Sequence, residues 1–386
     1  MQAGLNERQV GVLFTLTLAG DAGISLWLTT SADRFGRKRT LIVGALLMLG
    51  AGVVFILSHN PLVLMAAAII GVISPSGNEI GPFLSVEQAA LTHLLPNERR
   101  TQVFAWYNLV GSFATATGAL SGGWIAELLQ GKGLSALGAY RVVLVGYVAG
   151  GFVLSVLFTL LSRAIEAVST PGTSPVRRVL GLHRSGTVVR RLSALFSVDA
   201  FAGGLIVQSM IAYWFHLKFG IEAGLIGSIF FGTNVLAGIS ALSAAWLARR
   251  IGLINTMVFT HVPSNILLIL VPLMPTLPLA IAALLLRFSI SQMDVPTRQS
   301  YTMAVVEPDE RSAAAGITGI ARSVGAALAP SLTGIFLAAP ALISLPFFVS
   351  GGLKLIYDGL LYRSFSSLRP PEERGVPPVS SAAQNR

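Results

Sequence analysis

Long apolar runs recur along the whole chain, and they leave little room for any fold other than a membrane one. A helix that crosses the hydrocarbon core of a bilayer needs about 20 mainly apolar residues. Eleven runs satisfy this rule: 10–31, 40–58, 62–93, 101–128, 141–162, 192–216, 223–248, 253–274, 277–306, 312–338 and 342–362. Hydrophobic residues make up 53% of the 386 residues and charged residues only 11%. The sequence therefore predicts an all-α, polytopic membrane protein.

Basic residues concentrate in alternate loops, which predicts the orientation of the chain. If the loop around Asp33 faces the cytosol, nineteen of the 27 Lys and Arg residues lie in cytosolic loops or the tail, and four lie outside. This bias is typical of the cytoplasmic side of a membrane. We expect a cytosolic carboxyl end in a plasma membrane. The net charge of +10 then reflects orientation and contact with the lipid bilayer, with no nucleic-acid partner.

Residues 32–39, with the sequence ADRFGRKR, form a dense charge cluster between the first two runs. They predict a tight loop, in which Gly36 supplies the positive φ that an abrupt reversal needs. The pattern resembles a signature of the major facilitator superfamily, in which Asp-Arg-x-Gly-Arg-Lys joins the second and third helices. The family pattern begins with Gly four residues before the Asp, where this sequence has the small residue Thr29.

An internal repeat supports the resemblance, because a Pro-x-Glu-Arg pattern at 96–99 and again at 308–311 stands between two long runs. The resemblance implies two related helical bundles. The predicted units are residues 1–162 (a bundle of five helices), 163–191 (a cytosolic linker), 192–368 (a bundle of six helices) and 369–386 (a disordered cytosolic tail). The family is built from twelve helices, so we expect that its first helix is missing from this sequence. An upstream in-frame apolar segment would support this expectation.

Charged residues near the cytosolic loops are candidates for a gate. The resemblance implies that Asp33, Arg34, Gly36, Arg37 and Glu87 form contacts that exist in one transport state and break in the other. The alternative is a solvated loop that only sets orientation. A further candidate, Arg298, lies near the cytosolic end of its run, where a salt bridge that closes the gate is expected.

Polar residues within the apolar runs are candidates for a solute or proton pathway, since each must face protein or water. The run 277–306 carries Arg287, Gln292 and Asp294 and is broken by Pro296. Arg287, near the midplane, could bind an anionic group or hold a carboxylate whose protonation is coupled to transport. The alternative is a buried Arg287–Asp294 pair that only fixes the helix.

Two further runs carry candidates of the same kind. Two prolines and two glycines interrupt the run 62–93 around Asn78 and Glu79, and such breaks are tolerated only beside protein or a water-filled cavity. In the run 192–216, Gln208 is a pathway candidate, and Asp199 could be a protonation site or could cap a break at 203–204. Asp21 in the first run could serve protons or solute, or could form an interhelical hydrogen bond.

Three other polar residues predict structural roles. Lys354 and Asp358 stand four residues apart, so we expect them to pair on one helix. Arg322 could pair with a carboxylate such as Asp21 or with exposed carbonyls. His261 is expected to be a packing residue.

These features together predict a secondary transporter of a small organic solute or drug-like compound, working by alternating access. The buried carboxylates favour coupling to protons, and uniport or another coupling ion is left open. The alternatives are a membrane sensor or scaffold that does not transport and, with less support, a polytopic membrane enzyme. The absence of a phosphate-binding loop argues against ATP-driven transport, and the absence of cysteine argues against thiolate metal sites. The sequence also has no histidine cluster, His-Glu-x-x-His or Gly-x-Ser-x-Gly motif, so we expect no enzymatic activity. We expect no cofactor, no metal site and a monomer.

Overall fold

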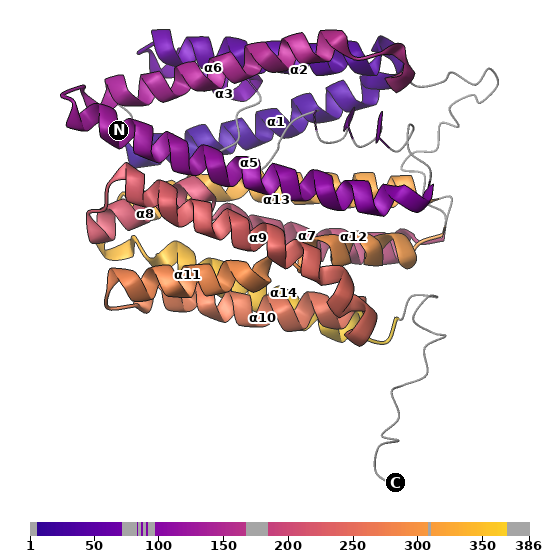
Figure 1. Cartoon of the computed structure of the whole chain (residues 1–386). Helices are drawn as coiled ribbons and strands as arrows, with labels where there is room; N and C mark the ends of the chain where they lie inside the picture. The colour runs from indigo at the N-terminus through magenta and orange to yellow at the C-terminus, as the bar shows by residue number, and fades with distance from the viewer. Residues whose placement is uncertain are drawn as a thin grey trace, which may run out of the picture.

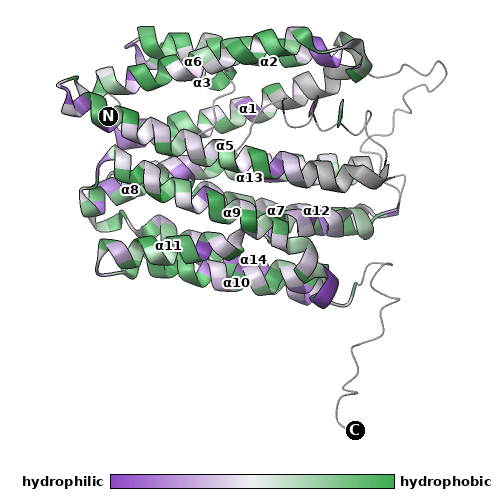
Figure 2. Ribbon diagram, viewed as in Figure 1, coloured by the Kyte–Doolittle hydropathy of each residue, from purple (hydrophilic) through white to green (hydrophobic). Residues whose placement is uncertain are grey.

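A computed structural model describes residues 6–71, 83, 86–87, 90–91, 97–166, 184–307 and 310–368, with the backbone alone at 25, 26, 28–34, 97–105, 163 and 311–313. No strand occurs in these described residues, which are mostly helical. Within the described ranges, eight helical segments are long and apolar enough to cross a membrane. Hydrophobic residues extend along most of their length (Figure 2). The chain is a multi-pass, all-α membrane protein, as predicted.

Helices occur within each of the eleven predicted runs. The first half of the chain forms α1 (Glu7–Phe35), α2 (Arg37–Leu57), α3 (Pro61–Ile70), α5 (Asn97–Gly131) and α6 (Ala136–Leu160). The second half forms α7 (Gly186–Gly204), α8 (Gln208–Phe219), α9 (Ala223–Ile251), α10 (Leu253–Leu270), α11 (Leu277–Ser291), α12 (Asp294–Ala304), α13 (Arg311–Leu337) and α14 (Leu345–Phe365). Single 3₁₀ turns lie at Arg163–Ile165, Val271–Leu273 and Pro340–Leu342.

The helices form two bundles that meet along two seams. Helices α2, α3 and α6 lie on one side of the molecule and α10, α11 and α14 on the other (Figure 1). Between them, α1 packs along α13, and α5 packs along α9. We call the end where α1 meets α2 the linker end, and the opposite end, where α1 begins and α13 ends, the far end.

Backbones touch directly in both seams. A Cβ added to Gly11 of α1 would lie 2.6 Å from the Pro330 carbonyl oxygen of α13, and one added to Gly227 of α9 would lie 2.5 Å from the Ala119 carbonyl oxygen of α5. Hydrogen bonds support this approach: the Ser331 hydroxyl lies 2.7 Å from the Thr15 hydroxyl across the first seam. The seams therefore depend on small residues, and toward the far end they hold the bundles together.

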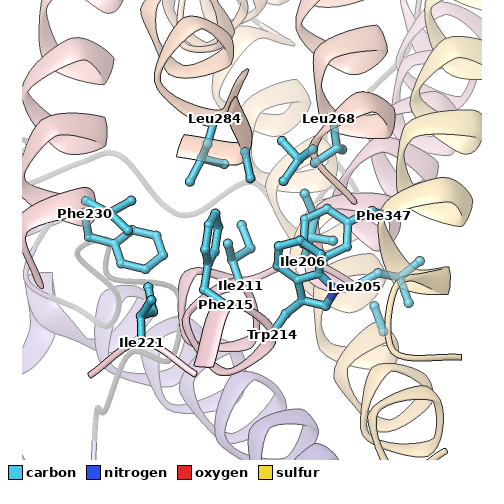
Figure 3. Close-up of a cluster of buried hydrophobic side chains, with 14 residues drawn as sticks. Leu205, Ile206, Ile211, Trp214, Phe215, Ile221, Phe230, Leu268, Leu284 and Phe347 are labelled. Atoms are coloured by element: carbon cyan, nitrogen blue, oxygen red, sulfur yellow. The ribbon is translucent and has the colours of Figure 1, made fainter. Parts of the chain in front are cut away.

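A break between α7 and α8 is held by side chains of neighbouring helices. The run predicted at 192–216 divides after Gly204, and the carbonyl oxygens of Ala202 and Leu205 accept hydrogen bonds of 2.7 Å from the hydroxyls of Ser350 and Thr333. Beyond the break, aromatic and aliphatic side chains of α8 pack among residues of α10, α11 and α14 (Figure 3). The two hydroxyl hydrogen bonds satisfy the carbonyls of Ala202 and Leu205, which would have no partner in a lipid bilayer.

The second break lies three or four residues before the predicted position. The helix ends at Ser291 and restarts at Asp294, so Pro296 lies in the first turn of α12. A proline is tolerated there because the first turn of a helix has no intrahelical partner for its amide hydrogens.

Candidate functional site

Asp199 of α7 lies at the centre of a group of buried charges. Its carboxylate oxygens lie 2.6 Å from Lys354 Nζ, 3.3 Å from Arg322 Nη1 and 3.4 Å from Arg298 Nη1. Arg298 also forms an ion pair of 2.7 Å with Asp294, four residues before it. The carboxylate of Asp199 thus forms ion pairs with three cations from three different helices.

A second branch connects Asp199 to α10. The Nδ1 atom of His261 lies 2.7 Å from an Asp358 oxygen, and the Asn265 amide donates a hydrogen bond of 2.9 Å to the other oxygen. The Nε2 atom of His261 lies 3.8 Å from Asp199. The imidazole therefore stands between two carboxylates. We call the whole group the ion cluster: Asp199, His261, Asn265, Asp294, Arg298, Arg322, Lys354 and Asp358.

The ion cluster lies deep in the second bundle. Asp199 is thirteen residues from the start of α7, which at 1.5 Å per residue is about 20 Å from the linker end. Arg322 is eleven residues from the start of α13, which is about 16 Å. The ion-paired side chains are less than 10% exposed, except Arg322 at 34%. Burial of this kind is costly, and pairing with opposite charges offsets the cost.

The structure corrects two predicted partnerships. The Lys354–Asp358 pair is wrong, because Lys354 contacts Asp199 and Asp358 contacts His261. His261 is buried, as expected of a packing residue, and its imidazole has Asp358 as a partner. Asp294 forms its ion pair with Arg298 rather than with Arg287.

For Arg322, a carboxylate such as Asp21 and exposed carbonyls were left open as partners, and the structure shows a carboxylate, although not that of Asp21. Its guanidinium contacts Asp199, while Asp21 lies buried on α1 of the first bundle. Gln208 and Gln292 lie outside the ion cluster. The side-chain oxygen of Gln208 accepts a hydrogen bond of 3.4 Å from Asn234 of α9, and the backbone amide of Gln292 donates one of 3.3 Å to the Ser240 hydroxyl.

Some candidates fall outside what is described. Asn78 and Glu79 lie outside the described residues. Asp33 and Arg34 belong to α1 by their backbone, and their side chains are not among those described.

The gate candidate Glu87 lies among the described residues. It accepts a hydrogen bond of 2.5 Å from the Tyr107 hydroxyl.

The charged loop predicted at 32–39 reduces to one residue. Helix α1 continues to Phe35 and α2 begins at Arg37, so Gly36 alone makes the reversal, with φ 97° as predicted. The carboxylate of Glu166 accepts hydrogen bonds from the backbone amides of Arg37 (2.7 Å) and Lys38 (3.3 Å). A carboxylate at this position accepts hydrogen bonds from the free amides of the first turn, and its negative charge interacts favourably with the positive end of the helix dipole.

The second bundle contains a similar contact. Glu310 is fully buried, and its two oxygens accept hydrogen bonds of 2.8 Å from the backbone amides of Arg184 and Ser185 at the start of α7. The repeat at 308–311 pointed to Glu310, whereas no sequence signal pointed to Glu166. Both contacts lie at the linker end.

Two helical bundles with glycine-lined seams and charges at mid-depth define a membrane protein of the transporter type. A family model described as Major Facilitator Superfamily matches residues 1–330. The chain belongs to this superfamily.

Related proteins agree with this assignment. The chain is 32% identical to the uncharacterized membrane protein YJR124C of Saccharomyces cerevisiae, over 92% of this chain and 86% of the relative. A bacterial homologue of the human lysosomal transporter Spinster, in an inward-facing and occupied conformation, superposes with a TM-score of 0.69 at 16% identity, over 95% of this chain and 91% of that one. A D-xylose–proton symporter superposes with a TM-score of 0.72 at 13% identity, over 93% and 89%. At these identities the two structures show the fold alone.

Proposed function

We propose that the chain is a secondary transporter that moves a small organic solute by alternating access, with the movement coupled to protons. The observation that carries the proposal is the ion cluster, in which charged groups from α7, α10, α12, α13 and α14 meet at mid-depth. Ionisable residues inside a membrane are expensive and mark the pathways of solutes and ions. A bundle with a purely structural role could pack apolar side chains at these positions.

The motion that the proposal needs takes place at the two seams between the bundles. Near the far end, α1 and α13 touch at Gly11 and Gly334, and α5 and α9 touch at Gly123 and Gly227. Rocking of one bundle against the other would open these contacts and close the linker end, where Gly36 and its charged neighbours lie. We place the linker end in the cytosol of a plasma-membrane protein, in line with the distribution of Lys and Arg.

His261 is the proposed proton carrier, because it stands between Asp358 and Asp199. A histidine is the side chain whose charge most readily changes between pH 5 and 8. When His261 gains a proton, its charge competes with Lys354 for the same Asp199 oxygen. Protonation therefore weakens the bond between α7 and α14 and couples proton binding to helix movement.

A His261→Gln variant tests this role in proteoliposomes that contain a pH-sensitive dye. With the wild-type chain, a transported solute from a broad panel is expected to move protons along with it. The variant should lose this proton signal, since glutamine cannot take up a proton, while it still exchanges labelled solute across the membrane.

His216→Gln is the matched control. His216 lies in the last turn of α8, where its ring contacts the Ile221 carbonyl, so its loss should leave the proton signal intact. Equal proton movement in wild type and His261→Gln would contradict the role of His261.

A further inference from the structure

Arg287 of α11 differs from the other buried cations of the second bundle. Its residue surface is 8% exposed, and its Nε atom is buried without a hydrogen-bond partner among the described residues. Its guanidinium stacks on Phe288, with 4.9 Å between the guanidinium carbon and the ring centre. Arg298, Arg322 and Lys354 each lie within 3.4 Å of a carboxylate oxygen, and no described carboxylate is that close to Arg287.

The charge balance around Arg287 is unequal. The ion cluster and Arg287 together contain four fixed cations, on Arg287, Arg298, Arg322 and Lys354, and three carboxylates, on Asp199, Asp294 and Asp358. Protonation of His261 would only increase the excess. Among these groups the cations therefore outnumber the carboxylates by one.

A buried donor without an acceptor needs a physical explanation. Stacking on a phenylalanine ring is favourable for a guanidinium, but the ring accepts no in-plane hydrogen bond. Buried polar groups in native proteins are almost always bonded, and exceptions occur where a ligand or ion completes the site. Within the part of the chain that the structure describes, the Nε atom of Arg287 lacks such an acceptor.

We propose that Arg287 binds the anionic group of the solute, a carboxylate or a phosphate, so that the substrate is a small organic anion. This inference rests on the proposed function of the chain as a transporter. The planar guanidinium presents its donors in a fork that matches such groups. Arg322, the member of the ion cluster with a one-third exposed side chain, offers an accessible cation at similar depth.

The first test needs no knowledge of the solute. The full chain is purified in detergent, and its Tm is followed by the fluorescence of its five tryptophans. Without ligand, Arg287→Met should raise the Tm by about 2 °C or more, because the variant removes an uncompensated buried charge. The matched variant Arg298→Met removes a cation that is paired with Asp294 and should lower the Tm. A fall in Tm with both variants would overturn the inference.

The second test uses matched probes at constant ionic strength: succinate and succinamide, benzoate and benzamide, glycerol 3-phosphate and glycerol. An anion should raise the Tm of the wild type, its neutral partner should not, and Arg287→Met should abolish the shift. Arg249→Gln, which removes an exposed charge at the linker end of α9, should keep it. An unchanged shift in Arg287→Met, or an equal shift with the neutral partner, would overturn the inference.

Transport assays separate this inference from the proposed function. If a neutral solute is carried equally by the wild type and Arg287→Met, the anion site is wrong and the transporter assignment stands. If anions bind through Arg287 but no bound anion crosses the membrane, the transporter assignment is wrong and the anion site stands.

Discussion

Asp199→Asn is expected to cause the largest loss of stability among single substitutions in the ion cluster. Asparagine fills the same volume but carries no charge, so Lys354, Arg298 and Arg322 lose the carboxylate that they share. Removing one partner of a buried ion pair costs about 3–5 kcal/mol, because the remaining charge stays buried. For a chain of this size the Tm should fall by about 4–6 °C. Thermal unfolding of the purified chain measures it.

Two further variants make the Asp199 prediction specific. Asp199→Asn combined with Lys354→Met should recover part of the lost Tm, since one stranded cation is removed with its partner. Asp358→Asn should cost less, because the partners of Asp358 are His261 and the neutral Asn265. A Tm of Asp199→Asn equal to that of the wild type would contradict the role given to this carboxylate.

A disulfide across the seam between α1 and α13 is expected to abolish transport. Thr15 and Ser331 have hydroxyl oxygens 2.7 Å apart, and cysteine is close in size to both residues. The paired substitutions Thr15→Cys and Ser331→Cys should therefore form a bond under mild oxidation. The chain has no cysteine of its own, so no background has to be removed. Solute uptake into proteoliposomes should stop on oxidation and return on reduction.

A disulfide within one bundle is the control for this experiment. A Cβ added to Gly122 of α5 would lie 3.6 Å from the Val143 side chain of α6, in the same bundle. Gly122→Cys with Val143→Cys should therefore cross-link without stopping transport. Full transport by the oxidised Thr15–Ser331 pair would show that the seam does not have to open.

The helices could be predicted from the sequence because the bilayer imposes a local rule. Each spanning helix needs its own apolar stretch, so the runs at 40–58 and 223–248 identify α2 and α9 with no knowledge of neighbours. Breaks were harder to predict. Gly203 and Gly204 indicated the end of α7, but Pro296 misled, because a proline is equally compatible with the first turn of a new helix.

The candidate site could be predicted only in part, since a charge in an apolar run is visible while its partner is not. Asp199, Asp294 and Arg298 were identified in this way. Their pairing involves residues up to 155 positions apart, which no spacing rule reveals. The spacing of Lys354 and Asp358 suggested a local pair, but in a packed interior the carboxylate of α7 and the imidazole of α10 bind them instead.

The contact of His261 with Asp358 was not predicted, because a single histidine in an apolar helix gives little signal. The available signal was Asn265, four residues later and on the same helix face, since two polar residues at this spacing point toward a common partner. In the structure that partner is Asp358. Pairs of polar residues at helical spacing within apolar runs are therefore better indicators of buried networks than isolated ones.

The most direct test of alternating access is a distance measurement between spin labels on the two bundles. The exposed positions Lys132→Cys and Ala341→Cys report on the far end, and Arg39→Cys and Arg249→Cys report on the linker end. In lipid nanodiscs, pulsed electron resonance should find two distance populations for each pair. A change of pH or an added transported solute should lengthen one pair as it shortens the other. A single, unchanging distance at both ends under all these conditions would contradict the account.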